Sequence, residues 1–218
     1  MLFRDRADAG RQLLARLQAY RGRPGLLVLG LPRGGVPVAD EVARGLGASL
    51  DVFVVRKLGV PGQEELAMGA IATGGVRVVN HEVVRALGLT PEMLDHAAAA
   101  EARELDRRQR SYRGERPEPV IAGRTVILVD DGLATGSTMR AAVAALRLQA
   151  PARLVVAVPV AAPAACAELA REVDEIVCGA TPEPFQSVGR FYDDFAQTSD
   201  EEVTERLAAA RVREALSS

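Results

Sequence analysis

Two adjacent carboxylates, Asp130 and Asp131, stand at the most informative point of this 218-residue sequence. They follow four apolar residues at positions 126–129, a run typical of a buried strand. Open α/β sheets bind their ligands at the carboxyl ends of strands. Carboxylates also accept hydrogen bonds from neighbouring hydroxyl groups. The pattern therefore predicts that this pair binds the diol of a sugar.

The residues after the pair predict an anion site. Gly132 and Gly136 lie in a loop with the hydroxyls of Thr135, Ser137 and Thr138, and a helix-forming stretch follows. Backbone N–H groups, hydroxyl donors and the helix dipole can then converge on one phosphate. The glycine spacing is one residue short of a P-loop, and the P-loop lysine is absent. A diol site beside a phosphate site suits a ribose 5-phosphate.

Lys57 is the single lysine among 27 basic residues. It follows Arg56, at the end of an expected strand. A lysine carries a compact point charge that arginine does not replace. Either chance or a specific contact with an anion accounts for its presence.

Alternating strand and helix patterns predict an α/β fold with an open, mostly parallel sheet flanked by helices. The expected strands are 25–30, 50–55, 125–129, 153–158 and 174–178, and the helices between them are 36–46, 137–148 and 163–171. Further expectations are an N-terminal helix within 5–20, a hairpin at 68–80, helices at 81–87 and 91–112, and a last helix that starts at Ser199. We expect a single domain, 1–218, with an insertion at 67–118 and a small hood formed by 1–20 and 180–218.

Composition excludes several classes of function. The formal net charge of −2 gives no reason to expect a nucleic acid or an anionic membrane as partner. No apolar run reaches the roughly 18 to 20 residues of a membrane helix, and the charged residues 1–10 do not form a signal peptide, so we expect a cytoplasmic protein. Cys166 and Cys178 are expected to be reduced packing residues.

The segment 126–138 resembles the signature of the type I phosphoribosyltransferases, and its wording is closest to the adenine phosphoribosyltransferase branch. This resemblance implies the ligand 5-phosphoribosyl 1-pyrophosphate (PRPP), with Mg²⁺ bound through PRPP and no direct metal ligand in the protein. Asp130 and Asp131 would hold the ribose hydroxyls. The 5-phosphate loop would consist of Ala134, Thr135, Gly136, Ser137 and Thr138.

The resemblance also implies a pyrophosphate loop after the first strand, at 31–35, with a cis peptide bond that we place between Pro32 and Arg33. The pyrophosphate would be bound by Arg33, Gly34, Gly35, Arg56 and Lys57. Arg56, Lys57, Asp130 and Asp131 would form the catalytic set. The segment 58–66 would be a closing lid that excludes water.

The acceptor stays open. Ala134 replaces an aspartate of the hypoxanthine and guanine branch, which disfavours a 6-oxopurine. The catalytic glutamate of the adenine branch is also missing, and Glu64 and Glu65 are the nearest substitutes. Phe185 and Tyr192 could stack on a planar acceptor, or they could be core residues.

We therefore expect a phosphoribosyltransferase that moves the 5-phosphoribosyl group from PRPP to a purine-like nitrogenous base with release of pyrophosphate. We also expect a homo-oligomer, such as a dimer. The alternative is a PRPP-binding regulator without turnover that acts on nucleic acid or on a protein partner. In that case the arginines at 103–116 would form its contact surface, although interleaved acids favour an ordinary ion-paired surface.

Overall fold

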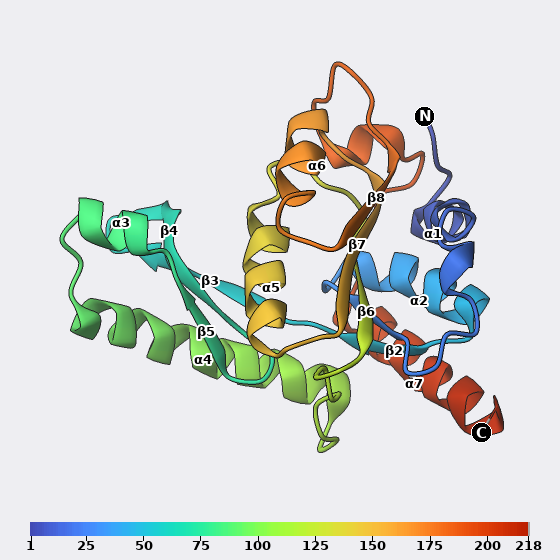
Figure 1. Cartoon of the computed structure of the whole chain (residues 1–218), viewed down its shortest axis with the longest axis horizontal. Coiled ribbons are helices and arrows are strands. Elements are labelled where there is room, and N and C mark those ends of the chain that lie inside the picture. Colours follow the sequence, from blue (N-terminus) through green and yellow to red (C-terminus); the bar gives the residue numbers. More distant parts are fainter. Residues whose placement is uncertain (218) are drawn as a thin grey trace.

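The main sheet has five parallel strands in the order β2-β1-β6-β7-β8 (Figure 1). Their bounds are β1 Leu27–Gly30, β2 Ser49–Val52, β6 Thr125–Val129, β7 Arg153–Val160 and β8 Glu175–Ala180. The computed structural model describes residues 1–217, without the side chains of Glu64, Glu65 and Ser217. The predicted fold class is confirmed, because the short apolar runs are buried strands of a parallel sheet.

Helices cover both faces of this sheet. One face carries α1 (Arg6–Leu14), α2 (Gly35–Leu46) and α7 (Asp200–Ser217), while α5 (Ser137–Leu148) and α6 (Pro163–Leu169) lie on the other (Figure 1). Alternate residues of a strand supply the two cores: Val28 packs in the cluster with α2, and Leu27 and Leu29 pack in the cluster with α5. None of the helices in the described part of the chain is long and apolar enough to span a bilayer.

A second, antiparallel sheet projects from the body, at the left of Figure 1. It consists of β3 (Val55–Val60), β4 (Gln63–Ala72) and β5 (Val76–Val79), followed by α3 (His81–Ala86) and α4 (Pro91–Arg113). The predicted hairpin at 68–80 is confirmed as β4 and β5, and the side chain of Thr90 caps α4 by accepting from Met93 N at 3.4 Å. The segment expected to be a lid, 58–66, forms the tip of the β3–β4 hairpin.

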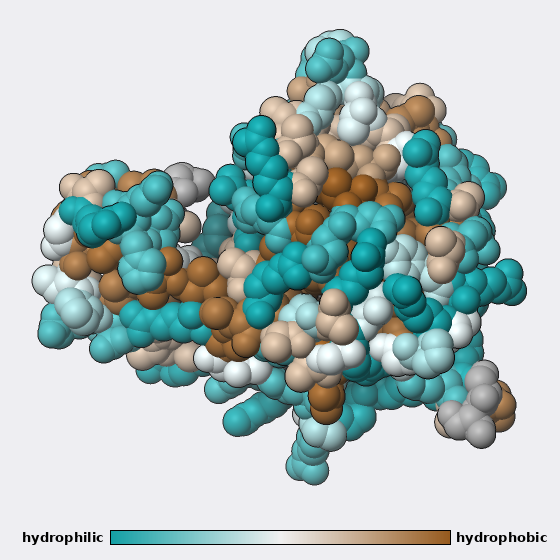
Figure 2. Space-filling model, in the orientation of Figure 1, coloured by the Kyte–Doolittle hydropathy of each residue, from teal (hydrophilic) through white to brown (hydrophobic). Residues whose placement is uncertain are grey.

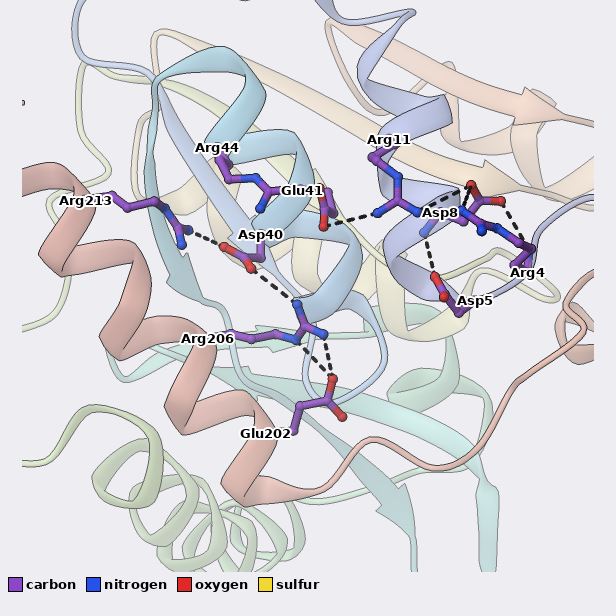
Figure 3. Close-up of polar contacts among 10 residues, drawn as sticks. All are labelled: Arg4, Asp5, Asp8, Arg11, Asp40, Glu41, Arg44, Glu202, Arg206 and Arg213. Carbon is purple, nitrogen blue, oxygen red and sulfur yellow. Dashed lines mark hydrogen bonds and ion pairs between the residues drawn. The ribbon is translucent and has the colours of Figure 1, made fainter.

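Ion pairs with a buried carboxylate of α2 hold the C-terminal helix α7 in place (Figure 3). Asp40 of α2 is only 7% exposed, and its carboxylate pairs with Arg206 at 3.3 Å and with Arg213. Arg206 also pairs with Glu202 of its own helix at 2.9 Å. A buried carboxylate needs such partners because its desolvation is costly. These ion pairs hold α7 against α2, the helix that follows the loop at 31–35 after β1.

The expectation for the two cysteines is wrong. Cys166 of α6 and Cys178 of β8 are joined in a disulfide, with their Cα atoms 6.8 Å apart. The count of two cysteines correctly excludes a disulfide framework, but it does not exclude one bridge. Only the crossover from β7 through α6 to β8 brings these two side chains together.

Candidate functional site

The candidate site lies where the strand order of the main sheet reverses. β1 and β6 are neighbours, and Gly30 at the end of β1 pairs with Val129 at the end of β6. The next strand in sequence after β1 is β2 on one side, whereas β7 follows β6 on the other side. The two loops that leave these strands therefore diverge and open a crevice, which is the usual ligand site of open α/β sheets.

The carboxylates of Asp130 and Asp131 lie at this crevice. Asp131 N donates to Asp130 Oδ1 at 2.9 Å, and Arg6 Nε donates to Asp131 Oδ2 at 2.8 Å. Burial raises the pKa of Asp130 well above its usual value, and the negative charge of Asp131 raises it further. Burial also raises the pKa of Asp131, while the hydrogen bond and charge of Arg6 oppose the rise. Each carboxylate accepts one hydrogen bond from another residue, so both keep acceptor capacity for the hydroxyls of a diol.

The glycine loop after β1 packs directly against this pair. The peptide bond between Pro32 and Arg33 is cis, as the family resemblance implied. A Cβ atom on Gly34 would lie 2.0 Å from Asp131 Oδ2, and one on Gly35 would lie 2.7 Å from Val129 O. Glycine is therefore required at both positions by the close approach of the loop to the end of β6.

Arg33 makes no ion pair with a described residue. Its positive charge acts on Tyr112, whose pKa is raised by burial and by the hydrogen bond from its hydroxyl to Asp200 and lowered by Arg33. Arg33 therefore lies within electrostatic range of the contact between Tyr112 of α4 and Asp200 of α7. Of this loop, the contacts at Gly34 and Gly35 place the backbone against the carboxylate pair.

The loop between Asp131 and α5 has the form of an anion site. Gly136 has φ +74°, which favours glycine, and α5 begins at the next residue. Leu133 anchors the loop, since its N–H donates to Val160 O at 2.9 Å and its carbonyl accepts from Ala162 N at 2.8 Å. The four flanking residues of the predicted phosphate loop, Ala134, Thr135, Ser137 and Thr138, are exposed. Their N–H and hydroxyl groups are accessible to a ligand at the N-terminus of α5.

Arg56 and Lys57, which the sequence assigned to one ligand, point to opposite faces of β3. Arg56 Nε donates to Glu101 of α4 at 2.6 Å. Lys57 lines a cavity of about 570 Å³ together with Thr135 and Ser137 of the anion loop and Arg140 of α5. Figure 2 shows the surface hollowed between the lobe that carries α3 and the body of the molecule. Lys57 thus faces the anion loop, and Arg56 faces α4.

Of the two roles considered for Tyr192, stacking on an acceptor or packing in the core, the structure favours packing. It is only 2% exposed, its ring centroid lies 5.2 Å from that of Phe3 and 4.9 Å from that of Phe195, and its hydroxyl donates to Asp131 O at 2.6 Å. Phe185 is half-buried, with its ring 5.3 Å from that of Phe191. A role of Phe185 toward the acceptor stays a prediction.

Sequence reasoning missed Arg6, whose side chain reaches the carboxylate pair from α1. No local signal identifies it among 27 basic residues, because its partner lies 125 positions away in the chain. The side chains of Glu64 and Glu65, considered above as substitutes for a catalytic glutamate, lie outside the described part of the structure.

Comparison with known proteins agrees with this geometry. The family model of the phosphoribosyl transferase domain matches residues 4–186. Proteins of Mycobacterium tuberculosis strains CDC 1551 and H37Rv, whose names assign them provisionally as phosphoribosyl transferases, are each 49% identical to this chain over 209 residues. The alignment covers 96% of this chain and 47% of each relative, so the chain spans about half their length.

A crystal structure of the protein TT1426 from Thermus thermophilus is 44% identical in sequence and has a TM-score of 0.86. It covers 96% of this chain and 99% of its own. The match of the family model extends from the N-terminal segment through both loops of the crevice, and it agrees with the resemblance that the residues at 126–138 indicated. The chain therefore belongs to the phosphoribosyl transferase domain family.

Proposed function

We propose that this chain binds PRPP at the crevice and transfers its 5-phosphoribosyl group to a nitrogenous base, purine-like in character, with release of pyrophosphate. One observation carries the proposal: the paired carboxylates lie between two loops that can each bind a phosphate group. The anion loop 132–138 leads into α5 on one side, and the glycine loop 32–35 packs against the pair on the other. PRPP has a phosphate on each side of its ribose hydroxyls, and its three parts match these three features.

The protein residues would act by binding and orientation. Asp130 and Asp131 would accept hydrogen bonds from the ribose hydroxyls, and the N–H groups at 134–138 would donate to the 5-phosphate. The backbone at 32–35 and the guanidinium of Arg33 would face the pyrophosphate. The family resemblance implied that Lys57 binds the pyrophosphate. Because Lys57 lines the same cavity as Thr135 and Ser137, its position favours a contact with the 5-phosphate instead.

The reaction breaks the bond between the anomeric carbon and a pyrophosphate oxygen and forms a bond from that carbon to a ring nitrogen of the base. The electron pair of the broken bond leaves with pyrophosphate, and the ring nitrogen loses its proton to solvent or a basic group. Positive charge develops on the sugar in the transition state, as in glycoside hydrolysis. Donors fixed around the leaving group then lower the barrier because negative charge grows on that group.

Magnesium fits this site through the ligand. The described residues contain no group of three His, Cys, Asp or Glu side chains placed to hold a metal ion. Mg²⁺ keeps several waters and binds readily to phosphate oxygens, so the pyrophosphate would hold it and it would neutralise charge there.

The regulatory alternative requires a free basic surface at 103–116, and the contacts of this segment do not favour one. Glu104 pairs with Arg107 at 2.7 Å and with Arg108 at 2.8 Å, and Arg113 pairs with Asp51 at 2.9 Å. These ion pairs neutralise part of the charge that would attract a nucleic acid.

Pyrophosphate release from PRPP and Mg²⁺ in a panel of purine, pyrimidine and precursor bases tests the proposal. We expect release with at least one base, and we expect the variant Asp130→Asn with Asp131→Asn to lose both turnover and PRPP binding. Tight PRPP binding without turnover across the panel would support the regulator. If the double variant binds PRPP as well as the wild type, the assignment of the carboxylates is refuted.

A further inference from the structure

Arg6 is held in place on three sides at the edge of the crevice. Its Nε donates to Asp131 Oδ2 at 2.8 Å, its Nη1 donates to Ala196 O at 2.6 Å, and its Cζ lies 4.0 Å from the centre of the Phe195 ring. The side chain is only 12% exposed, and that of Asp131 is 16% exposed. Exposed ion pairs contribute little, but a shielded guanidinium with a fixed geometry interacts strongly with a carboxylate.

The contact is specific to one oxygen of one carboxylate. Arg6 binds Oδ2 of Asp131, and Oδ1 accepts no hydrogen bond from another described residue. The backbone of the same residue is held separately, because Tyr192 donates its hydroxyl to Asp131 O at 2.6 Å. Arg6 and Tyr192 together fix the orientation of Asp131 and leave Oδ1 available to a ligand.

The Arg6 guanidinium also offsets the electrostatic repulsion between the neighbouring carboxylates of Asp130 and Asp131. The charged groups that face Asp131 are Asp130 and Arg6, and the neutral phenol of Tyr192 completes its surroundings. Burial favours the protonated form of both acids, and Arg6 favours the ionised form of both. An ionised carboxylate accepts hydrogen bonds with both oxygens. In a protonated carboxyl group one oxygen carries the proton and acts as a donor, so fewer acceptor sites are left for the ribose hydroxyls.

The fold of α1 does not depend on this contact. Asp5 caps the helix by accepting from Asp8 N at 2.7 Å, and Ala9 and Leu13 are buried in the core. Gly10 packs closely on α2, since a Cβ there would lie 2.7 Å from that of Glu41. These contacts lie on other parts of the helix, so the Arg6 side chain is available for the crevice.

We propose that Arg6 is a positioning residue for the ribose hydroxyls: its hydrogen bond to Oδ2 holds the Asp131 carboxylate so that Oδ1 is directed toward the sugar. This inference rests on the proposed function, because it assumes that the paired carboxylates bind a ribose. It assigns to α1 a role in the site that the motif at 126–138 does not contain.

Calorimetric titration with two probes, ribose 5-phosphate and inorganic phosphate, tests the proposal in the full chain. The variants are Arg6→Gln, which removes the charge, and Arg6→Lys, which keeps it. The matched control is Arg11→Gln on the same helix, where Arg11 pairs with Asp8 and Glu41 away from the crevice (Figure 3). Inorganic phosphate has no diol, so it reports on the phosphate-binding loops without the carboxylate contacts.

At neutral pH we expect Arg6→Gln to weaken ribose 5-phosphate binding about tenfold or more, as for loss of a charge-assisted contact. Binding of inorganic phosphate should change less than about twofold. The pH below which ribose 5-phosphate affinity falls should rise in Arg6→Gln, because the pKa of Asp131 rises without its cation. Arg6→Lys should restore that pH profile, and Arg11→Gln should match the wild type.

Several results would overturn the inference. Wild-type affinity and an unchanged pH profile in Arg6→Gln would refute it while leaving the proposed function intact. Equal losses for both probes, or a pH profile that Arg6→Lys does not restore, would show a merely structural role. Failure of the wild type to bind ribose 5-phosphate or PRPP would instead refute the proposed function.

Discussion

Gly34→Ala is the sharpest test of how closely the glycine loop approaches the carboxylate pair. Gly34 has φ −62° and ψ −30°, which alanine adopts without strain, so any cost must come from contact. The added Cβ would lie 2.0 Å from Asp131 Oδ2 and 2.8 Å from its Cγ, whereas ordinary contacts begin at 3.4 Å. The Asp131 carboxylate must therefore move by more than about 1 Å, which breaks its 2.8 Å hydrogen bond with Arg6.

The expected loss of unfolding free energy is about 1.5 to 3 kcal/mol, the value of a hydrogen bond between charged groups. Urea unfolding measures it, with the midpoint and slope fitted together. The decisive comparison is the Asp131→Ala background, in which the clashing atoms are gone and the next nearest atom to the new Cβ is Arg6 Nε, at 3.1 Å. There we expect Gly34→Ala to cost less than about 1 kcal/mol.

Gly35→Ala is the matched control for this cycle. Its Cβ would meet Val129 O at 2.7 Å and Asp130 Cα at 2.9 Å, which are backbone atoms that Asp131→Ala does not remove. Its cost should be the same in both backgrounds. If Gly34→Ala is equally costly with and without the Asp131 side chain, the contact described above does not decide the need for glycine.

Three further outcomes are expected. In urea unfolding, Asp130→Asn should stabilise the folded chain more at pH 8 than at pH 5. Burial raises the pKa of Asp130 in the folded state above its pKa in the unfolded state. The wild-type carboxylate therefore destabilises the fold at high pH, and this penalty disappears as the pH falls toward the unfolded-state pKa. An unchanged difference between the two pH values would contradict the raised pKa. Tyr192→Phe should lower the unfolding free energy by about 1 kcal/mol through loss of the hydrogen bond to Asp131 O, and a neutral result would argue against that bond. Reduction of the Cys166–Cys178 bridge, which closes a separation of 12 residues, should lower the unfolding free energy by about 2 to 3 kcal/mol, with the double serine variant insensitive to reductant; free thiols in the oxidised protein would exclude the bridge.

Local sequence was sufficient for most of the fold and for the centre of the site. The apolar run before Asp130, the hydroxyl-rich loop after it and the helix from Ser137 are all contiguous, and the structure places them as expected. Such features depend on a few neighbouring residues, whose backbone preferences are visible without tertiary contacts.

Contacts between distant segments could not be predicted in this way. The side chains of Arg56 and Lys57 point apart because adjacent residues of a strand face opposite sides of the sheet. Arg56 pairs with Glu101 because α4 packs on its side of the strand. Tyr192 became a packing residue because the N-terminal segment, through Phe3, covers its ring. Each outcome depends on which surfaces the fold brings together.

The sequence by itself therefore determined the parallel sheet, the position of the carboxylate pair after β6 and the glycine turn before α5, because these arise from periodicity and from motifs within single turns. The tertiary structure alone decided that Arg6 holds Asp131, that Lys57 faces the anion loop and that Cys166 meets Cys178. The physical reason is that an ion pair, a cavity and a disulfide are set by distances between side chains, and packing fixes those distances only when the whole chain is folded.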